Sequence, residues 1–146
     1  KNGTVLEKIN QFTPELARQI SYPGVRDFYN NLSCPRVYIS RNVAQVVDAF
    51  AQNFRFSQSF AEEFDKKSAL SKVCQSYPLA KTFIVRGDSL EDAEIVQLLE
   101  DKKRQGEIED VVSICVCQES KEPAFQADIY TSRDQTLLAK IFNESS

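Results

Sequence analysis

The alternation of apolar and polar residues along the chain predicts helices separated by short strands. Apolar residues spaced three and four apart indicate amphipathic helices, and short runs of β-branched and aromatic residues indicate strands. Helices are predicted over 24–32, 42–54, 65–77, 91–103 and 134–142, and residues 4–20 are predicted to form either a helix or a loop followed by a helix. Strands are predicted over 36–40, 82–85 and 111–117, with a short strand or turn at 126–130 and either a loop or a short strand at 56–64.

This order of elements predicts the fold class. Residues 111–117 form a continuous apolar run, which is typical of a strand inside a parallel sheet. Strands that alternate with helices favour a three-layer α/β sandwich around a mostly parallel, doubly wound sheet. We expect the strands near 36–40, 82–86 and 111–117 to be adjacent or nearly so, in a single domain over residues 1–146.

Composition narrows the classes of partner. The net charge of −3 argues against nucleic acid as a general partner. No apolar run approaches the roughly 20 residues that span a bilayer, so no membrane segment is expected. The polar N-terminus shows no signal-peptide pattern, and the four cysteines contain no CxxC pair. We therefore expect a cytoplasmic protein with buried free thiols, in which Cys115 and Cys117 share one strand face.

The chain contains no histidine, and this excludes catalytic triads built on that residue. Catalysis would have to use carboxylates, lysine, hydroxyl groups and a metal ion. The segment 83–94 (FIVRGDSLEDAE) carries the clearest candidates, because Asp88 and Asp92 follow an apolar strand and lead into a helix. Carboxylates at the carboxyl end of a buried strand suit Mg²⁺, which takes oxygen ligands. Alternatively, Asp88 and Asp92 only cap the helix.

Two further candidates precede this segment. Ser40 ends the strand VYIS, and Lys66 opens the helix that follows a charged segment, with Lys67 as the alternative lysine. The carboxyl ends of parallel strands lie on one edge of a sheet, so these groups and Asp88 can converge there. Together they suit a phosphate and Mg²⁺ site. Alternatively, Ser40 is only a helix cap and the lysines are exposed surface charges.

At this point the sequence resembles the haloacid dehalogenase superfamily of phosphatases. Strand-Ser40, helix-opening Lys66 and strand-GDxxxD (Asp88 and Asp92) follow the order of that family's second, third and fourth motifs. Residues 22–25 (YPGV) look like the turn before its second motif, and residues 127–130 (ADIY) resemble its closing segment. The resemblance implies an Mg²⁺-dependent phosphatase that forms an aspartyl-phosphate, with a core that lacks a cap domain.

The family's first motif, DxDGT, has no complete counterpart in residues 1–146. Asn2-Gly3-Thr4 either is the tail of such a motif, with Asn2 in place of its second Asp and the nucleophile before Lys1, or is merely a turn. In the first case the first strand of the sheet also precedes Lys1. A core without a cap would suit a bulky phosphorylated substrate, or a small one covered by a second subunit of a homo-oligomer.

Three functions are compatible with these observations. The first is an Mg²⁺-dependent phosphomonoester hydrolase with Asn2, Ser40 and Lys66 in catalysis and Asp88 and Asp92 at the metal, Asp92 as the weaker or indirect ligand. The second is a protein of the same fold that has lost its nucleophile and works in binding or regulation. A receiver-like signalling domain fits less well, because its acidic residues come early in the chain and its lysine comes last.

Overall fold

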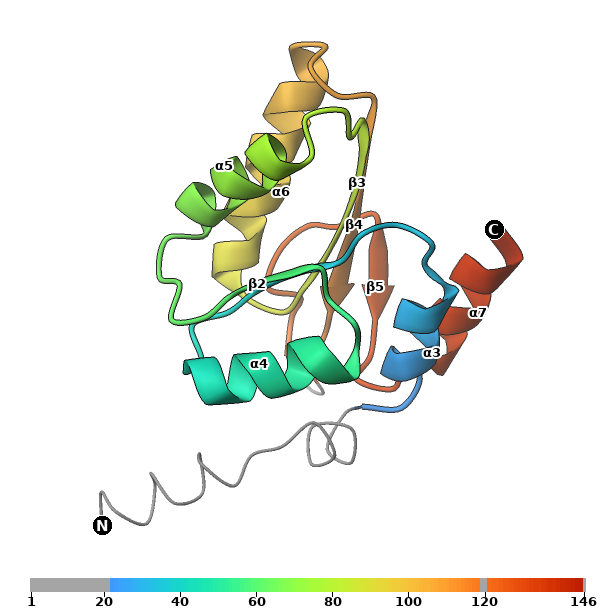
Figure 1. Ribbon diagram of the computed structural model, residues 1–146. Helices are drawn as coiled ribbons and strands as arrows, with labels where there is room; N and C mark the ends of the chain where they lie inside the picture. Colours follow the sequence, from blue (N-terminus) through green and yellow to red (C-terminus); the bar gives the residue numbers. More distant parts are fainter. Residues whose placement is uncertain (1–21, 119–120, 146) are drawn as a thin grey trace. The chain divides into compact units, whose positions relative to one another are not determined.

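The computed structural model describes residues 22–118 and 121–145, which form helices and parallel strands (Figure 1). They divide into two compact units. Of the described residues, one holds 22–64 together with 135–145, and the other holds those within Asp65–Asp134. The predicted mixed α/β class is confirmed, with the strands in two small parallel sheets. The segment 4–20, predicted to contain a helix, lies outside the described residues.

The first unit combines a pair of parallel strands with helices. Its elements are α3 (Val25–Asn31), β1 (Val37–Ile39), α4 (Ala44–Asn53), β2 (Gln58–Phe60) and α7 (Thr136–Ser145). Strand β2 resolves the ambiguous segment 56–64, because it pairs with β1 from Val37↔Gln58 to Ile39↔Phe60. The expected strand at 36–40 therefore has β2 as its partner, in a sheet separate from the one that contains the strands near 82–86 and 111–117.

Aromatic side chains fill the core of the first unit. The ring of Tyr29 lies 5.3 Å from that of Phe54 and 5.1 Å from that of Phe56, measured between centroids. Tyr38, on β1, also contacts Phe56, and Phe50 of α4 stacks on Phe54. Such rings bury large apolar areas and prefer these edge-on and offset geometries. Phe50 of α4 therefore faces the core of this unit.

Helices α3 and α7 pack together although they are more than 100 residues apart. Phe28 and Phe142 meet edge to face at 5.2 Å, and the Asn31 amide donates a hydrogen bond to the Ala139 carbonyl at 2.8 Å. Gly24 precedes α3 with a φ of 81°, and a Cβ there would collide with the backbone of Gln135 and Thr136. Only glycine suits both the left-handed backbone and this close approach.

The second unit contains a three-stranded parallel sheet and two helices in its described part. Its elements are α5 (Lys66–Ser76), β3 (Thr82–Gly87), α6 (Leu90–Arg104), β4 (Asp110–Val116) and β5 (Ile129–Thr131). The strand order is β3-β4-β5, with Gly87 opposite Cys115 and Ile114 opposite Ile129. The predicted strand 111–117 is thus the central strand, and Val111 and Ser113–Val116 are buried on both of its faces.

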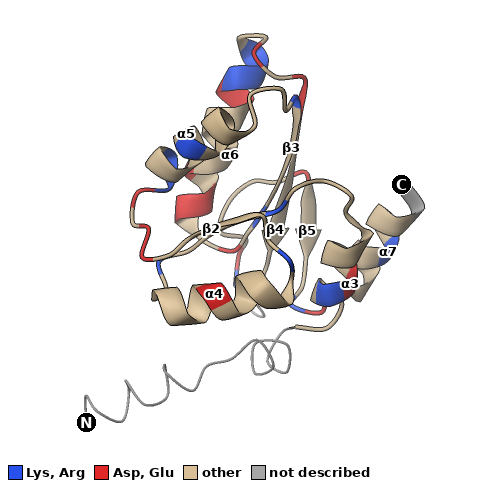
Figure 2. Ribbon diagram, in the orientation of Figure 1, with Lys and Arg blue, Asp and Glu red and all other residues tan. Residues whose placement is uncertain are grey.

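Helix α6 crosses from β3 to β4 and packs against both strands and α5. Glu91 and Asp92 lie in its first turn, and Lys102, Lys103 and Arg104 lie in its last turn (Figure 2). Acidic residues at the start of a helix and basic residues at its end interact favourably with the helix dipole. The basic residues at its end pair with nearby acids, as in Lys103–Asp110 at 3.2 Å. The end of α6 therefore carries a set of exposed ion pairs.

Strand β5 begins at Ile129, later than the start of the predicted segment 126–130. At the preceding position the side chain of Asp128, in place of its backbone, accepts the hydrogen bonds from β4. The Asp128 carboxylate accepts hydrogen bonds from the backbone N–H and the hydroxyl of Ser113, at 2.9 and 3.2 Å. The Ser113 hydroxyl in turn accepts from the Asp128 N–H at 2.9 Å. This contact connects the central strand to the residue just before β5.

Candidate functional site

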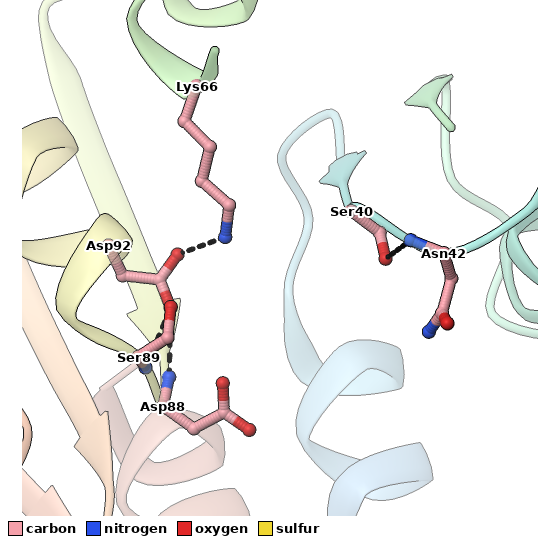
Figure 3. Close-up of polar contacts among 6 residues, drawn as sticks. All are labelled: Ser40, Asn42, Lys66, Asp88, Ser89 and Asp92. Carbon is pink, nitrogen blue, oxygen red and sulfur yellow. Dashed lines mark hydrogen bonds and ion pairs between the residues drawn. The ribbon is translucent and has the colours of Figure 1, made fainter. Parts of the chain in front are cut away.

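The candidate site of the second unit is built on the turn between β3 and α6. Gly87 ends the strand, Asp88 and Ser89 form the turn, and Ser89 is the N-cap of the helix. The carboxylate of Asp92 folds back over this turn (Figure 3). A Cβ atom at Gly87 would collide with the carboxyl group of Asp92, so the missing side chain makes room for this arrangement.

Both carboxylate oxygens of Asp92 have partners. Its Oδ2 accepts hydrogen bonds from the Asp88 N–H at 3.0 Å, the Ser89 N–H at 3.1 Å and the Ser89 hydroxyl at 2.9 Å. Its Oδ1 accepts a hydrogen bond from the Lys66 amine at 2.6 Å. This is the helix-capping role weighed as the alternative for Asp92, combined with an ion pair.

The contact between Lys66 and Asp92 connects two helices across 26 positions of sequence. The two side chains are 12% and 10% exposed, so the charges are mostly shielded from water and compensate each other. Lys66 is the first residue of α5, whose N-cap Asp65 accepts from the Ser68 N–H at 3.1 Å. Lys67 is exposed, and no hydrogen bond or ion pair of its amine occurs among the described residues. The lysine that contacts one of the predicted carboxylates, Asp92, is therefore Lys66.

Asp88 differs from Asp92 in being exposed. Within the described parts of the chain its carboxylate makes no hydrogen bond or ion pair, and it points away from the Asp92 carboxylate (Figure 3). Asp88 borders an open cavity of about 130 Å³ at the carboxyl end of the sheet, where Gly87 lies opposite Cys115. The cavity is also lined by Val116, Cys117, Gln118, Lys121, Glu122 and Ala124.

Ser40 belongs to the first unit, where it follows β1. Its N–H donates to the Phe60 carbonyl and its own carbonyl accepts from the Glu63 N–H, both at 2.9 Å. Its hydroxyl oxygen accepts a hydrogen bond from the Asn42 N–H at 3.1 Å (Figure 3). The N-cap of α4 is Val43, so the predicted capping role of Ser40 is a turn contact before the helix instead. Its convergence with Lys66 and Asp88 stays a prediction.

Asn2, the remaining candidate, lies outside the described residues. Ser89 and the segment after β4 were not among the candidates. A serine three residues before an acidic residue is the sequence signal of a capping box, so Ser89 was detectable. No sequence signal of this kind marks the cavity residues Gln118, Lys121 and Glu122. They lie next to Asp88 only because β4 ends beside β3.

Of the two predicted metal ligands, Asp88 is the one whose carboxylate has no partner among the described residues. Among residues 22–118 and 121–145, no group of three or more His, Cys, Asp or Glu side chains could hold a metal ion. Mg²⁺ usually keeps several waters and uses one or two protein carboxylates, so Asp88 alone is compatible with part of such a site. Asp92 already accepts four hydrogen bonds, so it suits an indirect role better than direct ligation.

The four cysteines are free thiols in different environments. Cys115 is fully buried, Cys74 and Cys117 are half-buried, and Cys34 is exposed, contrary to the burial expected for it. Burial raises the pKa of Cys117, and the neighbouring Cys115 raises it further. Burial likewise raises the pKa of Cys74.

No protein-family model matches this chain, and no curated protein matches it significantly. None of the helices in the described residues is long and apolar enough to cross a bilayer.

Proposed function

We propose that the protein is an Mg²⁺-dependent phosphomonoester hydrolase of the haloacid dehalogenase type. The observation that carries the proposal is the contact between Lys66 and Asp92 beside a turn that leaves Asp88 without a partner in the described residues. The order of motifs in the sequence predicted that a helix-opening lysine and the GDxxxD segment act together, and the two lie in direct contact. An ordinary capping aspartate needs no lysine from another helix.

Each residue of this cluster has a distinct part in the proposed reaction. Asp92 is a positioning residue, because it holds the Asp88–Ser89 backbone and the Lys66 amine together. Asp88 would bind Mg²⁺, which neutralises charge on the transferring phosphoryl group when it is bound. Lys66 adds a positive charge beside this carboxylate pair. Ser40 would donate its hydroxyl hydrogen to a phosphate oxygen, because its hydroxyl oxygen already accepts from Asn42.

The proposed chemistry needs a nucleophile, which the resemblance puts before Lys1. Its carboxylate would attack phosphorus and displace the alcohol, and water would then release phosphate from the aspartyl-phosphate. The substrate would be a phosphorylated small molecule or a larger phosphorylated one. Asn2 cannot transfer a proton as an aspartate does, so we expect a slower reaction than that of a complete first motif.

The proposal extends to the fold. We propose that both sheets belong to one mostly parallel, doubly wound sheet of a three-layer sandwich. The parallel pairing of every described strand supports it, as does the edge of β3 opposite β4, which has no strand partner among the described residues. An experimental structure of a form extended upstream of Lys1 tests this, and two sheets that remain separate in it would contradict it.

Activity is tested by comparing the 146-residue chain with a form that includes the residues encoded upstream of Lys1. With an aryl phosphate and Mg²⁺, we expect turnover from the extended form if it contains an Asp before Lys1, and little from the shorter one. An extended form that carries the Asp but stays inert against a panel of phosphate esters would favour a binding or regulatory protein. Robust turnover by residues 1–146 would show that the nucleophile has been misassigned.

Metal binding is tested separately by isothermal titration with Mg²⁺. Asp88→Asn should lose most of the affinity of the parent protein, because the amide oxygen carries no net charge. Glu109→Gln is the matched control, since Glu109 is an exposed carboxylate just before β4, at the opposite end of the strands. Equal Mg²⁺ affinity in the parent and in Asp88→Asn would refute the assignment.

A further inference from the structure

The open cavity at the carboxyl end of β3 and β4 combines apolar and polar side chains. Its apolar part is formed by Val116, Cys117 and Ala124. Its polar side chains are those of Asp88, Gln118, Lys121 and Glu122. Sites for small molecules combine an apolar lining with a small number of polar groups that fix the orientation of the ligand. The cavity therefore has the composition of a site for a small organic group.

The polar side chains of this cavity have no partners in the part of the chain that the structure describes. Gln118, Lys121 and Glu122 are exposed, and among residues 22–118 and 121–145 their side chains make no hydrogen bond or ion pair. The Lys66 amine, in contrast, pairs with the Asp92 carboxylate nearby in the same unit. The donors and acceptors of the cavity are therefore available to a ligand.

The volume of the cavity limits the size of that ligand. It is about 130 Å³, well below the roughly 300–1,000 Å³ of pockets that hold drug-sized molecules. A chain of a few carbon and oxygen atoms fits into such a space, whereas a nucleoside does not. The cavity therefore suits the short organic part of a small substrate.

Hydroxyl groups match this lining better than other small groups. A hydroxyl group both donates and accepts, so it can bond to the donors of Lys121 and Gln118 and to the Glu122 carboxylate. The cavity carries two carboxylates and one amine, so its net charge opposes an additional anionic group. An aryl group would displace water from these polar side chains without replacing its hydrogen bonds.

We propose that this cavity binds the alcohol part of a phosphomonoester and selects a short chain that carries free hydroxyl groups, as in glycerol 3-phosphate. The inference rests on the proposed function, because it requires the phosphoryl group to lie at Asp88, which borders the cavity. Lys121 and Gln118 then donate hydrogen bonds to hydroxyl oxygens of the alcohol, and Glu122 accepts one from a hydroxyl group. These three side chains bind the substrate and take no part in the chemical step.

Two-dimensional NMR of the 146-residue chain tests the proposal, with glycerol 3-phosphate and inorganic phosphate titrated separately in the presence of Mg²⁺. We expect glycerol 3-phosphate to bind about tenfold more tightly, since one hydrogen bond to a charged group contributes about this factor. The backbone signals of Gln118, Lys121 and Ala124 should shift with glycerol 3-phosphate and much less with phosphate. Lys121→Ala should remove most of the preference, because the alcohol loses its charged donor.

The matched control is Lys72→Ala, since Lys72 is an exposed lysine of α5 that does not line the cavity. It should keep the preference for glycerol 3-phosphate, and the spectra themselves verify that both variants are folded. Equal affinity for the two ligands in the parent protein, or no binding of glycerol 3-phosphate, would overturn the proposal. An unchanged preference in Lys121→Ala would also overturn it, as would tighter binding of phosphoserine, whose amino and carboxylate groups would instead pair with Glu122 and Lys121.

Binding and turnover separate a failure of this inference from a failure of the proposed function. Hydrolysis is measured on the form extended upstream of Lys1, whereas the preference between ligands is measured on residues 1–146 without turnover. An inert extended form together with a preference that depends on Lys121 would contradict the hydrolase and support the pocket. An active extended form without that preference would contradict the pocket alone.

Discussion

At the scale of single residues, the second unit depends on the buried carboxylate of Asp92. It joins the start of α5, the end of β3 and the start of α6 through one side chain. Removing one partner of a shielded ion pair leaves the other charge without compensation, and this loss is larger than the net value of the pair. Substitutions of the residues that contact Asp92 should therefore lower the free energy of unfolding by more than the loss of their apolar contacts alone would.

Lys66→Ala should destabilise the protein by about 3 kcal/mol, because it leaves the Asp92 carboxylate shielded from water without its cation. Lys67→Ala is the matched control, since its side chain is exposed and should change stability by less than about 0.5 kcal/mol. Urea unfolding of both variants measures the difference. Equal stability of the two variants would mean that the Lys66–Asp92 contact contributes nothing.

Gly87→Ala tests how tightly Asp92 lies over the turn. The added methyl group would meet the Asp92 carboxyl group and should cost about 1–3 kcal/mol through overpacking. Gly106→Ala is a useful contrast, because no atom lies within 4 Å of a Cβ there and only its φ of 78° opposes the substitution. Gly87→Ala should also weaken Mg²⁺ binding, whereas Gly106→Ala should not. An unchanged Mg²⁺ affinity in Gly87→Ala would separate the turn from the metal site.

At the scale of elements, the helices and strands of the second unit are joined by side chains that replace backbone contacts. The clearest example is Asp128, which occupies the position opposite Ser113 just before β5 begins. Its carboxylate satisfies a buried N–H group that the strand pairing leaves open. The start of the β4–β5 pairing is therefore set by one side chain.

Asp128→Ala should destabilise the protein by about 1–3 kcal/mol, because the buried Ser113 N–H and hydroxyl would lose their acceptor. Glu109→Ala, at an exposed acid beside the same strand, should have an effect within about 0.5 kcal/mol of zero. Thermal or urea unfolding distinguishes them. If Asp128→Ala is as stable as the parent, the prediction is wrong, and water replaces the carboxylate as hydrogen-bond acceptor of Ser113 without loss of stability.

The packing of α5 on α6 predicts a pH dependence. Burial raises the pKa of the Cys74 thiol above its ordinary value, the charge of Lys102 opposes this rise, and Glu107 adds to it. A group with a raised pKa in the folded state contributes stability that is complete below its unfolded pKa and lost as the pH rises through the folded value. Stability should therefore fall as the pH rises above the ordinary thiol pKa of about 8.5, and less steeply in Cys74→Ala than in the parent. Parallel slopes in urea unfolding at pH 8 to 10 would contradict this.

At the scale of the whole molecule, the proposed reaction depends on residues at the beginning of the chain. In the form extended upstream of Lys1, Asn2→Asp should raise turnover of an aryl phosphate by up to about 10²-fold or more, the usual contribution of a general acid and base. Asn2→Ala is the control and should not raise it. No gain with Asn2→Asp would favour the interpretation of Asn2-Gly3 as a simple turn.

The sequence alone predicted the mixed α/β class and most helix positions, which the structure confirms, and it proposed the β3–α6 turn as the candidate site. Periodicity reports which face of an element is buried, and that information is local, so α3, α4, α5 and α6 begin and end within two residues of the predicted ranges. Motif order also predicted that Lys66 acts with the GDxxxD segment.

Only the tertiary structure decided which partners those residues meet. It distinguished Lys66 from Lys67, showed that the Asp92 oxygens are already hydrogen-bonded, and identified β2 as the partner of β1. It also placed the segment after β4 beside Asp88. These contacts join residues far apart in sequence, and their geometry is set by how strands and helices pack, which spacing along the chain does not encode.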